Sequence, residues 1–200
     1  MNNLLELFAG TKSVSKTVGD KYDNVVSVDI SDKFKPTHVV DIMTFDYKKY
    51  PRNHFRTIWG SPPCTQYSKA KSRGVRDIVG ANAIVQRTLD IIAYFTPDTW
   101  FIENPQTGKL KDQPMMQKLP YYDVDYCRYG KLYRKRTRIW TNLEGFTPRL
   151  CRGKGKCTAM EGGHHIQSVG CGAPEYGAGL SLYDKYSIPQ PLLRDLFQTL

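Results

Sequence analysis

The first 30 residues alternate apolar and helical segments in an order that restricts the fold. An apolar run over residues 4–8 is followed by Gly10, and a helix-compatible segment covers 13–18. A β-branched run over 25–28 then ends at Asp29. A strand, a helix and a second strand at this spacing indicate a βαβ unit, in which the two strands lie parallel. We therefore expect an α/β fold built around a largely parallel sheet.

The same alternation continues along the chain. Residues 57–59 indicate a brief strand, and the apolar residues from 81 to 95 recur at the spacing of a helix. A buried strand is expected over 99–102. Ligands of open α/β sheets bind at the carboxyl ends of the strands, so the polar side chains there should face one cleft. They are Asp29, Asp41, Cys64 and Glu103.

Length and composition favour a single domain. A chain of 200 residues that is 40% hydrophobic and 12% aromatic can bury one core, and it is too apolar to be disordered. After Pro120 the alternation gives way to a basic, glycine-rich segment that carries Cys and His. We expect residues up to about 120, with a returning element at 181–200, to form the body, and about 140–180 to form a small insertion.

Most of the net positive charge lies in one segment. The chain carries a net charge of +10, and residues 127–160 hold ten basic side chains and one acid, or +9. An anionic polymer such as DNA is the partner that this segment favours, and a solvated surface run is the alternative. The basic residues are Arg128, Lys131, Arg134, Lys135, Arg136, Arg138, Arg149, Arg152, Lys154 and Lys156.

The sequence also predicts where the protein works. Glu6 interrupts the only early apolar stretch, and five cysteines, an odd number, favour a reducing compartment. The longest strongly apolar runs, of about five residues, are far shorter than the roughly 20 residues that cross a bilayer. We expect a cytoplasmic protein that contacts no membrane and acts as a monomer.

Cys64 is the first candidate for chemistry. Pro62 and Pro63 fix the backbone before it and therefore the direction of its thiol, which suits a nucleophile. Glu103 follows the next expected strand, where a carboxyl group can bind and polarise a ring held against the thiol. The alternatives are a cysteine that fills space in the core and a carboxylate that is only a surface charge.

Four short motifs follow one another in the sequence. They are Leu7-Phe8-Ala9-Gly10, Ser61-Pro62-Pro63-Cys64 with Tyr67-Ser68, Glu103-Asn104-Pro105, and Arg136-Thr137-Arg138. In this order they resemble the cytosine carbon-5 DNA methyltransferases, and most of all the short phage- and virus-type members. The resemblance covers about 140 residues. It implies the class I methyltransferase fold, a Rossmann-like sheet, here with a small Cys/His-containing recognition insertion.

The resemblance also implies a mechanism. Cys64, as a thiolate, would add to carbon 6 of cytosine, and Glu103 would bind ring nitrogen 3 and the exocyclic amine. Carbon 5 would then take a methyl group from S-adenosylmethionine. The arginine that matches Arg136 or Arg138 would hold the cytosine oxygen, and Asn104 would tie down the loop that carries the cysteine.

A cofactor site is implied in the same way. The aromatic ring of Phe8 would pack on adenine, and Gly10 would let the backbone approach the methionine part. Asp29 would bind the ribose and Asp41 the adenine amine. The complete set of expected cofactor residues is Phe8, Ala9, Gly10, Thr11, Ser13, Asp29, Ile30, Asp41 and Pro62.

The glycine loop departs from the family pattern. Gly10-Thr11-Lys12-Ser13 stands where further glycines are usual. The side chains of Thr11, Lys12 and Ser13 can bind the methionine carboxylate, and the N-terminus of the following helix favours an anion. The departure leaves open a modified donor that carries another alkyl group. Residues 183–200 resemble the helix that closes beside this loop.

A possible metal site lies in the insertion. Cys151, Cys157, His164, His165 and Cys171 fall within 21 residues, with Cys127 upstream. A structural zinc ion would compensate for the small core of this segment, and ordinary cysteines are the alternative. The resemblance favours Cys127, Cys151, Cys157 and His165 as ligands, with Cys171 as the alternate.

Two alternatives to DNA methylation stay open. The region that the resemblance assigns to target recognition is cut down to roughly 40 residues, between Trp140 and Leu180, which makes RNA or another cytosine carrier a credible substrate. The altered glycine loop, and Arg134 where a glutamine often precedes the paired arginines, would also suit a catalytically silent DNA-binding relative. Cys64 and Glu103, both present, argue against a silent protein.

Overall fold

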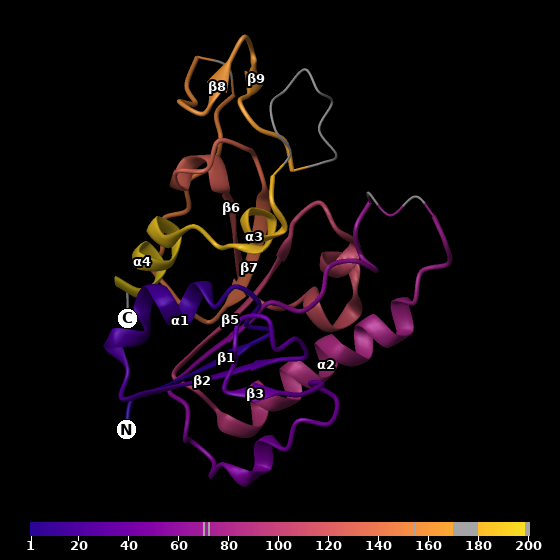
Figure 1. The fold of residues 1–200 in the computed structure, drawn as a ribbon, viewed down its shortest axis with the longest axis vertical. Helices are drawn as coiled ribbons and strands as arrows, with labels where there is room; N and C mark the ends of the chain where they lie inside the picture. Colours follow the sequence, from indigo (N-terminus) through magenta and orange to yellow (C-terminus); the bar gives the residue numbers. More distant parts are fainter. Residues whose placement is uncertain (70, 72, 154, 170–179, 199–200) are drawn as a thin grey trace.

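The computed structural model describes all residues except 70, 72, 154, 170–179 and 199–200. In the part that it describes, a seven-stranded sheet with the order β3-β2-β1-β4-β5-β7-β6 forms the centre of the molecule. Helices cover both faces of this sheet (Figure 1). A separate two-stranded element lies at one end of the molecule, beyond β6 and β7.

Five strands of the sheet run parallel, and two at one edge reverse direction. The parallel strands are β1 (Asn3–Leu7), β2 (Asn24–Asp29), β3 (His38–Val39), β4 (Thr57–Gly60) and β5 (Thr99–Pro105). Strand β7 (Arg136–Thr141) pairs antiparallel with β5, and β6 (Tyr121–Asp125) pairs antiparallel with β7. The expected α/β fold on a largely parallel sheet is therefore confirmed.

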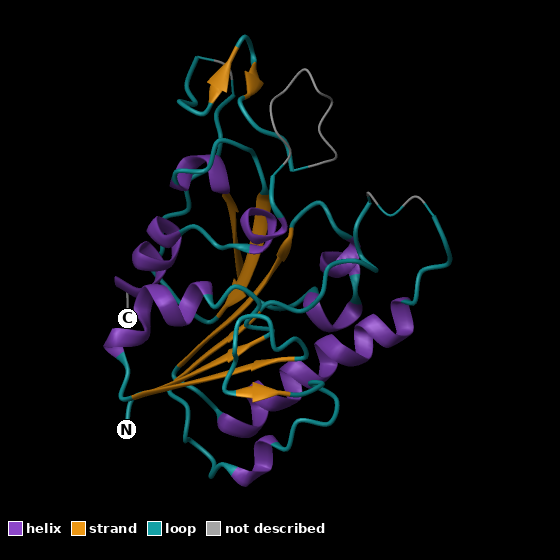
Figure 2. Ribbon diagram, in the orientation of Figure 1, coloured by secondary structure: helices purple, strands orange, loops and turns teal. Residues whose placement is uncertain are grey.

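The helices pack on opposite faces because successive side chains of a strand point to opposite sides. Helix α2 (Ile78–Phe95) covers the face that carries Leu5 and Ile58. Helices α1 (Ser13–Val18) and α4 (Gln190–Gln198) cover the other face, with Leu4 and Trp59 (Figure 2). A Cβ at Gly60 on β4 would lie 3.0 Å from Thr88 Cγ2 on α2, so glycine allows the helix and the sheet to approach this closely without a shift of Thr88.

Helix α1 was expected over the residues that form it, whereas α2 begins three residues before its expected start at 81. Asp77 caps α2 by accepting a hydrogen bond from the amide of Gly80 at 2.7 Å. Val79 in the first turn is 83% exposed, so the apolar periodicity that predicts a helix is lost there. The cap, rather than the hydrophobic pattern, sets the start of this helix.

The body extends beyond the expected boundary near residue 120. Strands β6 and β7 belong to the main sheet, so the body continues to Thr141. Between β7 and helix α3 (Leu182–Tyr186) lies the segment that we call the insertion, residues 142–181. In its described part it contains β8 (Met160–Glu161) and β9 (His164–His165).

Short 3₁₀ helices connect the larger elements. They are η1 (Gly19–Lys21), η2 (Tyr47–Lys49), η3 (Lys109–Asp112), η4 (Pro114–Met116) and η5 (Tyr126–Tyr129). Among the described residues, no helix combines the length and the apolar character that a membrane crossing requires.

Candidate active site

A cleft of about 560 Å³ opens at the carboxyl ends of the parallel strands. The four side chains expected there, Asp29, Asp41, Cys64 and Glu103, all line it. They follow or end strands β2, β3, β4 and β5, which is where open α/β sheets bind their ligands. The topology of the sheet thus brings together residues that lie up to 74 positions apart in the sequence (103 minus 29).

The loop after β1 forms one end of the cleft. Phe8, Gly10 and Lys12 have φ angles of 57°, 46° and 58°, so the chain turns through three left-handed residues. Such conformations are strained for residues other than glycine and are often found at binding sites. The hydroxyl groups of Thr11 and Ser13 lie 2.7 Å apart and both line the cleft.

All nine residues expected at the cofactor line this cleft. They are Phe8, Ala9, Gly10, Thr11, Ser13, Asp29, Ile30, Asp41 and Pro62. Two of the acids are oriented by the backbone. Asp29 accepts hydrogen bonds from the amides of Gly10 and Ser31, each at 2.8 Å, and Asp41 accepts one from Met43 at 2.9 Å.

The N-terminus of α1 already has a carboxyl partner within the chain, so two of its amides are not free for the cofactor carboxylate that was expected there. Glu6, only 2% exposed, accepts hydrogen bonds from the amides of Val14 at 3.1 Å and Ser15 at 3.0 Å. Burial raises the pKa of Glu6, while the hydrogen bonds from Ser15 and Val14 lower it. A lone acid in the middle of an apolar strand was the sequence signal for this cap.

The loop that carries Cys64 is held from both sides. Asn104 on β5 donates a hydrogen bond from Nδ2 to the carbonyl of Pro62 at 2.8 Å, as expected for a residue that ties this loop down. The amide of Tyr67 donates to the carbonyl of Cys64 at 3.0 Å and closes a turn after the thiol. Both contacts limit where the sulfur can lie, which favours attack along one line.

Glu103 lies beside a phenol and an ammonium group. Glu103 as a whole is 6% exposed, and Oε1 accepts a hydrogen bond from the Tyr126 hydroxyl at 3.2 Å. Lys135 Nζ lies 3.6 Å from the same oxygen. Burial, and then the charge of Glu103, raise the pKa of Tyr126 well above its usual value, so its phenol stays a hydrogen-bond donor.

The same charges act on the thiol of Cys64. Burial, and then the negative charge of Glu103, raise the pKa of the Cys64 thiol, whereas the positive charge of Lys135 lowers it. The thiol is therefore mostly protonated at neutral pH in the free protein. Lys135 is the side chain that offsets part of this effect.

The C-terminal elements close the end of the cleft that lies beside the loop after β1. Tyr183 and Tyr186 of α3 line it, and the ring of Tyr183 lies 6.0 Å from that of Phe34. The amide of Ile188 donates a hydrogen bond to Ser13 Oγ at 3.1 Å, which joins the returning element to the loop after β1. The expected closing role of residues 183–200 agrees with this packing, although the part played by Phe34 gave no signal in the sequence.

Comparison with known proteins identifies the family. The sequence model of C-5 cytosine-specific DNA methylases matches residues 3–114. The chain belongs to this family. It is also 37% identical over 174 residues to a protein of Frog virus 3 (isolate Goorha) named "Probable DNA (cytosine-5)-methyltransferase", covering 79% of this chain and 78% of the viral protein. Family and relative together show a DNA cytosine-5 methyltransferase, an enzyme class that uses S-adenosylmethionine.

Solved structures of methyltransferases share the fold of this family member. An E. coli prophage protein described as a DNA modification methyltransferase matches with a TM-score of 0.56 and 15% identity, over 74% of this chain and 51% of that one. Dnmt2 methyltransferase of S. pombe matches with a TM-score of 0.54 and 14% identity, over 80% and 59%. The chain thus spans little more than half the length of these proteins.

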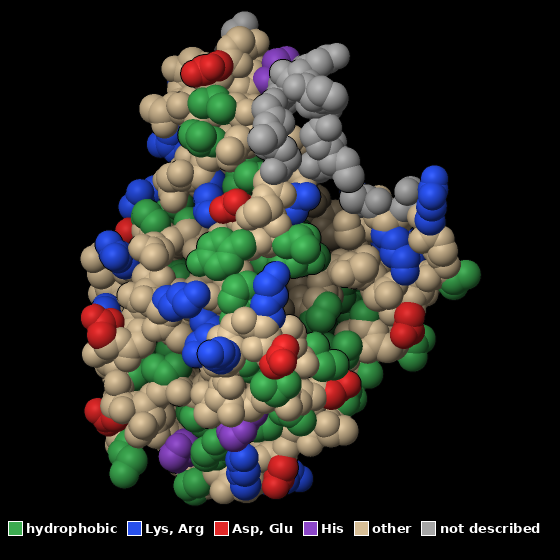
Figure 3. Space-filling view, viewed as in Figure 1, with side chains coloured by type: hydrophobic (Ala, Val, Ile, Leu, Met, Phe, Trp, Pro, Cys, Tyr) green, Lys and Arg blue, Asp and Glu red, His purple; other side chains and the backbone are tan. Residues whose placement is uncertain are grey.

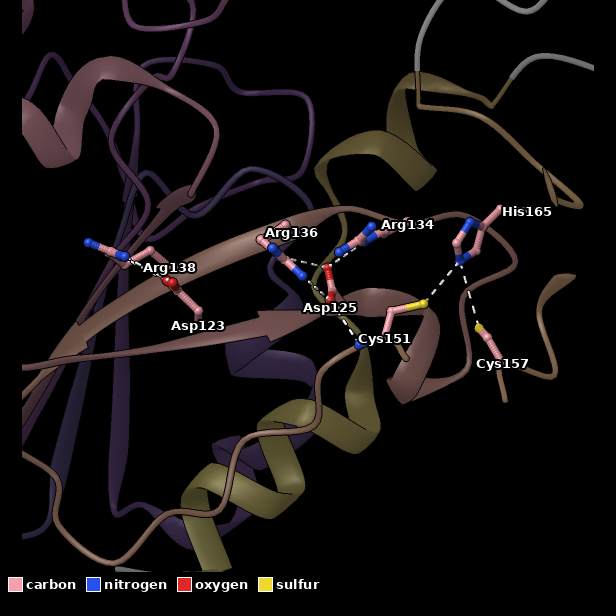
Figure 4. Close-up of polar contacts among 8 residues, drawn as sticks. All are labelled: Asp123, Asp125, Arg134, Arg136, Arg138, Cys151, Cys157 and His165. Carbon is pink, nitrogen blue, oxygen red and sulfur yellow. Dashed lines mark hydrogen bonds and ion pairs between the residues drawn. The ribbon is translucent and has the colours of Figure 1, made fainter. Parts of the chain in front are cut away.

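The two arginines of the family motif do not line the cleft of this methyltransferase. Arg136 and Arg138 lie opposite Asp125 and Asp123 on β6, and each pairs with its neighbour through two nitrogens (Figure 4). Lys135, which immediately precedes β7, lines the cleft instead. A signal for this was available, since neighbouring residues near a strand end tend to face opposite ways.

Ion pairs also engage much of the basic segment. Five of its described side chains pair with carboxylates outside residues 127–160: Arg134 and Arg136 with Asp125, Lys135 with Glu103, Arg138 with Asp123, and Arg149 with Asp195. Arg152 and Lys156 of the insertion are exposed. On the face seen in Figure 3, Lys and Arg side chains are spread out and interleaved with acids. The segment is therefore less uniformly positive in the fold than in the sequence.

The four residues expected to bind zinc come together. The ligand atoms of Cys127, Cys151, Cys157 and His165 all lie within 4.8 Å of one another. Cys171, the alternate ligand, lies outside the described residues. The cluster forms where the insertion meets η5, and none of its four residues lines the cleft of this methyltransferase.

Proposed function

We propose that this chain transfers the methyl group of S-adenosylmethionine to carbon 5 of cytosine in DNA through a covalent adduct with Cys64. The observation that carries the proposal is the composition of the cleft. The Cys64 thiol and the Glu103 carboxyl group share one cavity with the loop after β1 and the two oriented aspartates. The volume of about 560 Å³ lies within the range of sites that bind small molecules.

The donor set at one end of the cleft fits S-adenosylmethionine. When bound, this cofactor supplies an electrophilic methyl group on a sulfonium ion. Phe8 offers an aromatic face for the adenine ring, and Asp29 and Asp41 offer carboxylate oxygens for hydroxyl and amino hydrogens. The hydroxyl groups of Thr11 and Ser13 bind the polar end of the methionine part.

Cys64 and Glu103 act on the cytosine ring. The Cys64 thiolate adds to carbon 6, and the electron pair of the 5,6 double bond moves to carbon 5. Glu103 accepts a hydrogen bond from the exocyclic amine and shares a proton with ring nitrogen 3, and this proton stabilises the negative charge that develops on the ring. Carbon 5 takes the methyl group, then loses its proton to water, and the electrons of that bond restore the double bond and expel the thiolate.

Lys135 supports both groups. Its ammonium favours the ionised thiol and lies beside Oε1 of Glu103, which leaves Oε2 available for the base. Arg136 and Arg138 would have to leave their aspartates to reach a cytosine oxygen, so we assign that contact to Lys135.

Replacement of Lys135 should move the titration of Cys64. In Lys135→Met, loss of the cation raises the pKa of the thiol further, so its alkylation by iodoacetamide should shift to higher pH. Methyl transfer at neutral pH should fall on the order of 10²-fold. Lys131→Met is the control, because Lys131 Nζ bonds Ser187 Oγ and does not line the cleft. If the pH dependence of alkylation is unchanged in Lys135→Met, Lys135 does not influence the ionisation of Cys64.

DNA binding should depend on the exposed basic residues of the insertion. A base inside a duplex must be flipped out before Cys64 can reach it, which costs a few kcal/mol. Phosphate contacts from Arg152 and Lys156 offset that cost. The double variant Arg152→Gln/Lys156→Gln should bind duplex DNA more weakly, with a salt dependence reduced by about 1 for each lost contact, and bind S-adenosylmethionine normally.

A matched control removes the same charge elsewhere. Lys48 and Lys49 are exposed on η2, outside the insertion, so Lys48→Gln/Lys49→Gln should leave the salt dependence of binding unchanged. Equal weakening by both double variants would mean that only net charge matters, and would contradict the assignment to the insertion.

The carrier of the cytosine is tested with labelled S-adenosylmethionine. The enzyme is incubated with duplex DNA, single-stranded DNA and tRNA, and label at carbon 5 is measured in each. Highest transfer to DNA supports the proposal. Transfer to tRNA alone would assign the same chemistry to RNA, and cofactor binding without transfer to any carrier would indicate a silent relative.

A further inference from the structure

The insertion has almost no apolar core of its own. The buried cluster that joins it to the body consists of Cys127, Cys157 and Ala159, with Cys151 and Met160 packed against it. Its only strands in the described residues, β8 and β9, are two residues long each. Three of the five cluster members are cysteines, so burial of hydrocarbon contributes little to the order of the part around Cys151–Met160, whereas Leu143, Phe146, Val169 and Leu180 pack on the core of the body.

The spacing of the ligand atoms matches a tetrahedral site. His165 Nε2 lies 3.6 Å from the sulfur of Cys151 and 3.7 Å from that of Cys157. Zinc bonds of about 2.3 Å to sulfur and about 2.0–2.1 Å to nitrogen give, at a tetrahedral angle, a sulfur-to-nitrogen separation of about 3.6 Å. The sulfur of Cys127 completes the group within 4.8 Å.

We propose that Cys127, Cys151, Cys157 and His165 bind one zinc ion that fastens the insertion to the body of the enzyme. Three thiolates and one imidazole fill all four positions, so the site is structural and leaves no position for a substrate. Cys127 lies on η5 in the body, whereas the other three ligands lie in the insertion. Apolar side chains near the two ends of the insertion already pack on the core of the body, so the ion joins to the body the middle part, which carries the cysteines and His165.

A buried carboxylate connects this centre to β7. Asp125 is fully buried and accepts a hydrogen bond from the amide of Cys151 at 2.9 Å. It also pairs with Arg134 and Arg136, each at 3.1 Å, and these arginines flank Lys135 (Figure 4). Groups that orient metal ligands in this way commonly contribute to metal affinity. The centre thus also supports the turn that brings Lys135 to the cleft.

A disulfide is the competing use of these cysteines. A disulfide would pair two of the thiols and leave the third thiol and His165 without a function at this site. Zinc uses all four groups. The two states are distinguished by metal content and by the number of thiols that react under denaturing conditions.

The test is the zinc content of protein purified without chelators or a metal-binding tag. Elemental analysis should give about one zinc per chain for the unaltered enzyme and for Cys64→Ser, which lacks a cysteine outside the cluster. Cys151→Ser and His165→Ala should bind well under one equivalent. His165→Cys, which keeps a metal-binding side chain, should retain the ion, and X-ray absorption of the unaltered enzyme should show three sulfur and one nitrogen neighbours.

Opposite results would overturn the proposal. Well under one equivalent in the unaltered enzyme, or full zinc content in both Cys151→Ser and His165→Ala, contradicts the site. Loss of zinc from Cys171→Ser with retention in His165→Ala would assign the fourth ligand to Cys171 and contradict the set proposed here.

Variants that fail to fold do not decide the question, so a second measurement uses the unaltered chain. Removal of zinc by a chelator should lower the melting temperature and speed tryptic cleavage at Arg152 and Lys156, and added Zn²⁺ should reverse both effects. Unchanged stability and cleavage after complete zinc removal would contradict a fastening role. Neither measurement depends on methyl transfer, so failure of one proposal is distinguishable from failure of the other.

Discussion

Cys64→Ser should abolish methyl transfer, with a loss of at least about 10⁴-fold, because the serine hydroxyl is not ionised at neutral pH and does not add to carbon 6. Binding of S-adenosylmethionine should be unchanged, since Cys64 is not among the residues expected at the cofactor and serine is close to cysteine in size. The measurement is the transfer of labelled methyl groups to duplex DNA, combined with titration of the cofactor.

The variant should also keep its fold. Cys64 is partly exposed in a loop that Asn104 and Tyr67 hold through backbone carbonyls, and serine leaves both of those hydrogen bonds intact. Melting temperature and DNA binding should match those of the unaltered enzyme. Appreciable transfer by Cys64→Ser would show that another group attacks the base.

Glu103→Gln should have the second largest effect, a loss of about 10²–10³-fold in transfer. Glutamine keeps the shape of the side chain but cannot be an anion or a carboxylic acid donor. It still accepts the hydrogen bond from Tyr126, so the packing of this buried side chain should persist.

The direction in which the pKa of Cys64 moves in Glu103→Gln shows whether Glu103 acts on the base or through the thiol. The charge of Glu103 raises the pKa of Cys64, so its removal should lower that pKa and move thiol alkylation to lower pH. The nucleophile would then be more ionised while transfer is slower, which assigns the loss to the contacts with the base. If alkylation instead moved to higher pH together with the loss of activity, Glu103 would act through the thiol.

Local sequence patterns predict the parts of this site that depend on one strand and the loop after it. The βαβ opening places Asp29, and the proline pair places Cys64, without knowledge of distant contacts. All the expected cofactor residues line the cleft for the same reason. The family resemblance adds the zinc ligands, whose approach from separate segments no local pattern predicts.

The features of the structure that the sequence does not predict come from pairing between elements that are distant in the sequence. The antiparallel strands β6 and β7 follow Pro120, where the alternation of apolar segments had ended, so their pairing was not expected. That pairing sets Asp123 opposite Arg138 and Asp125 opposite Arg136, which draws both guanidinium groups away from the cleft. The use of Glu6 as a cap for α1 is likewise a contact across two elements.

The most direct test of a Cys64 adduct uses duplex DNA of random sequence in which 5-fluorocytosine replaces cytosine. After methyl transfer, carbon 5 carries fluorine and methyl and has no proton to lose, so the thiolate is not expelled. With S-adenosylmethionine present, mass spectrometry should show protein joined to DNA through Cys64, with one added methyl group, and no such species for Cys64→Ser. Methylation of ordinary DNA without any adduct on the fluorinated DNA, or an adduct on another residue, would contradict the mechanism.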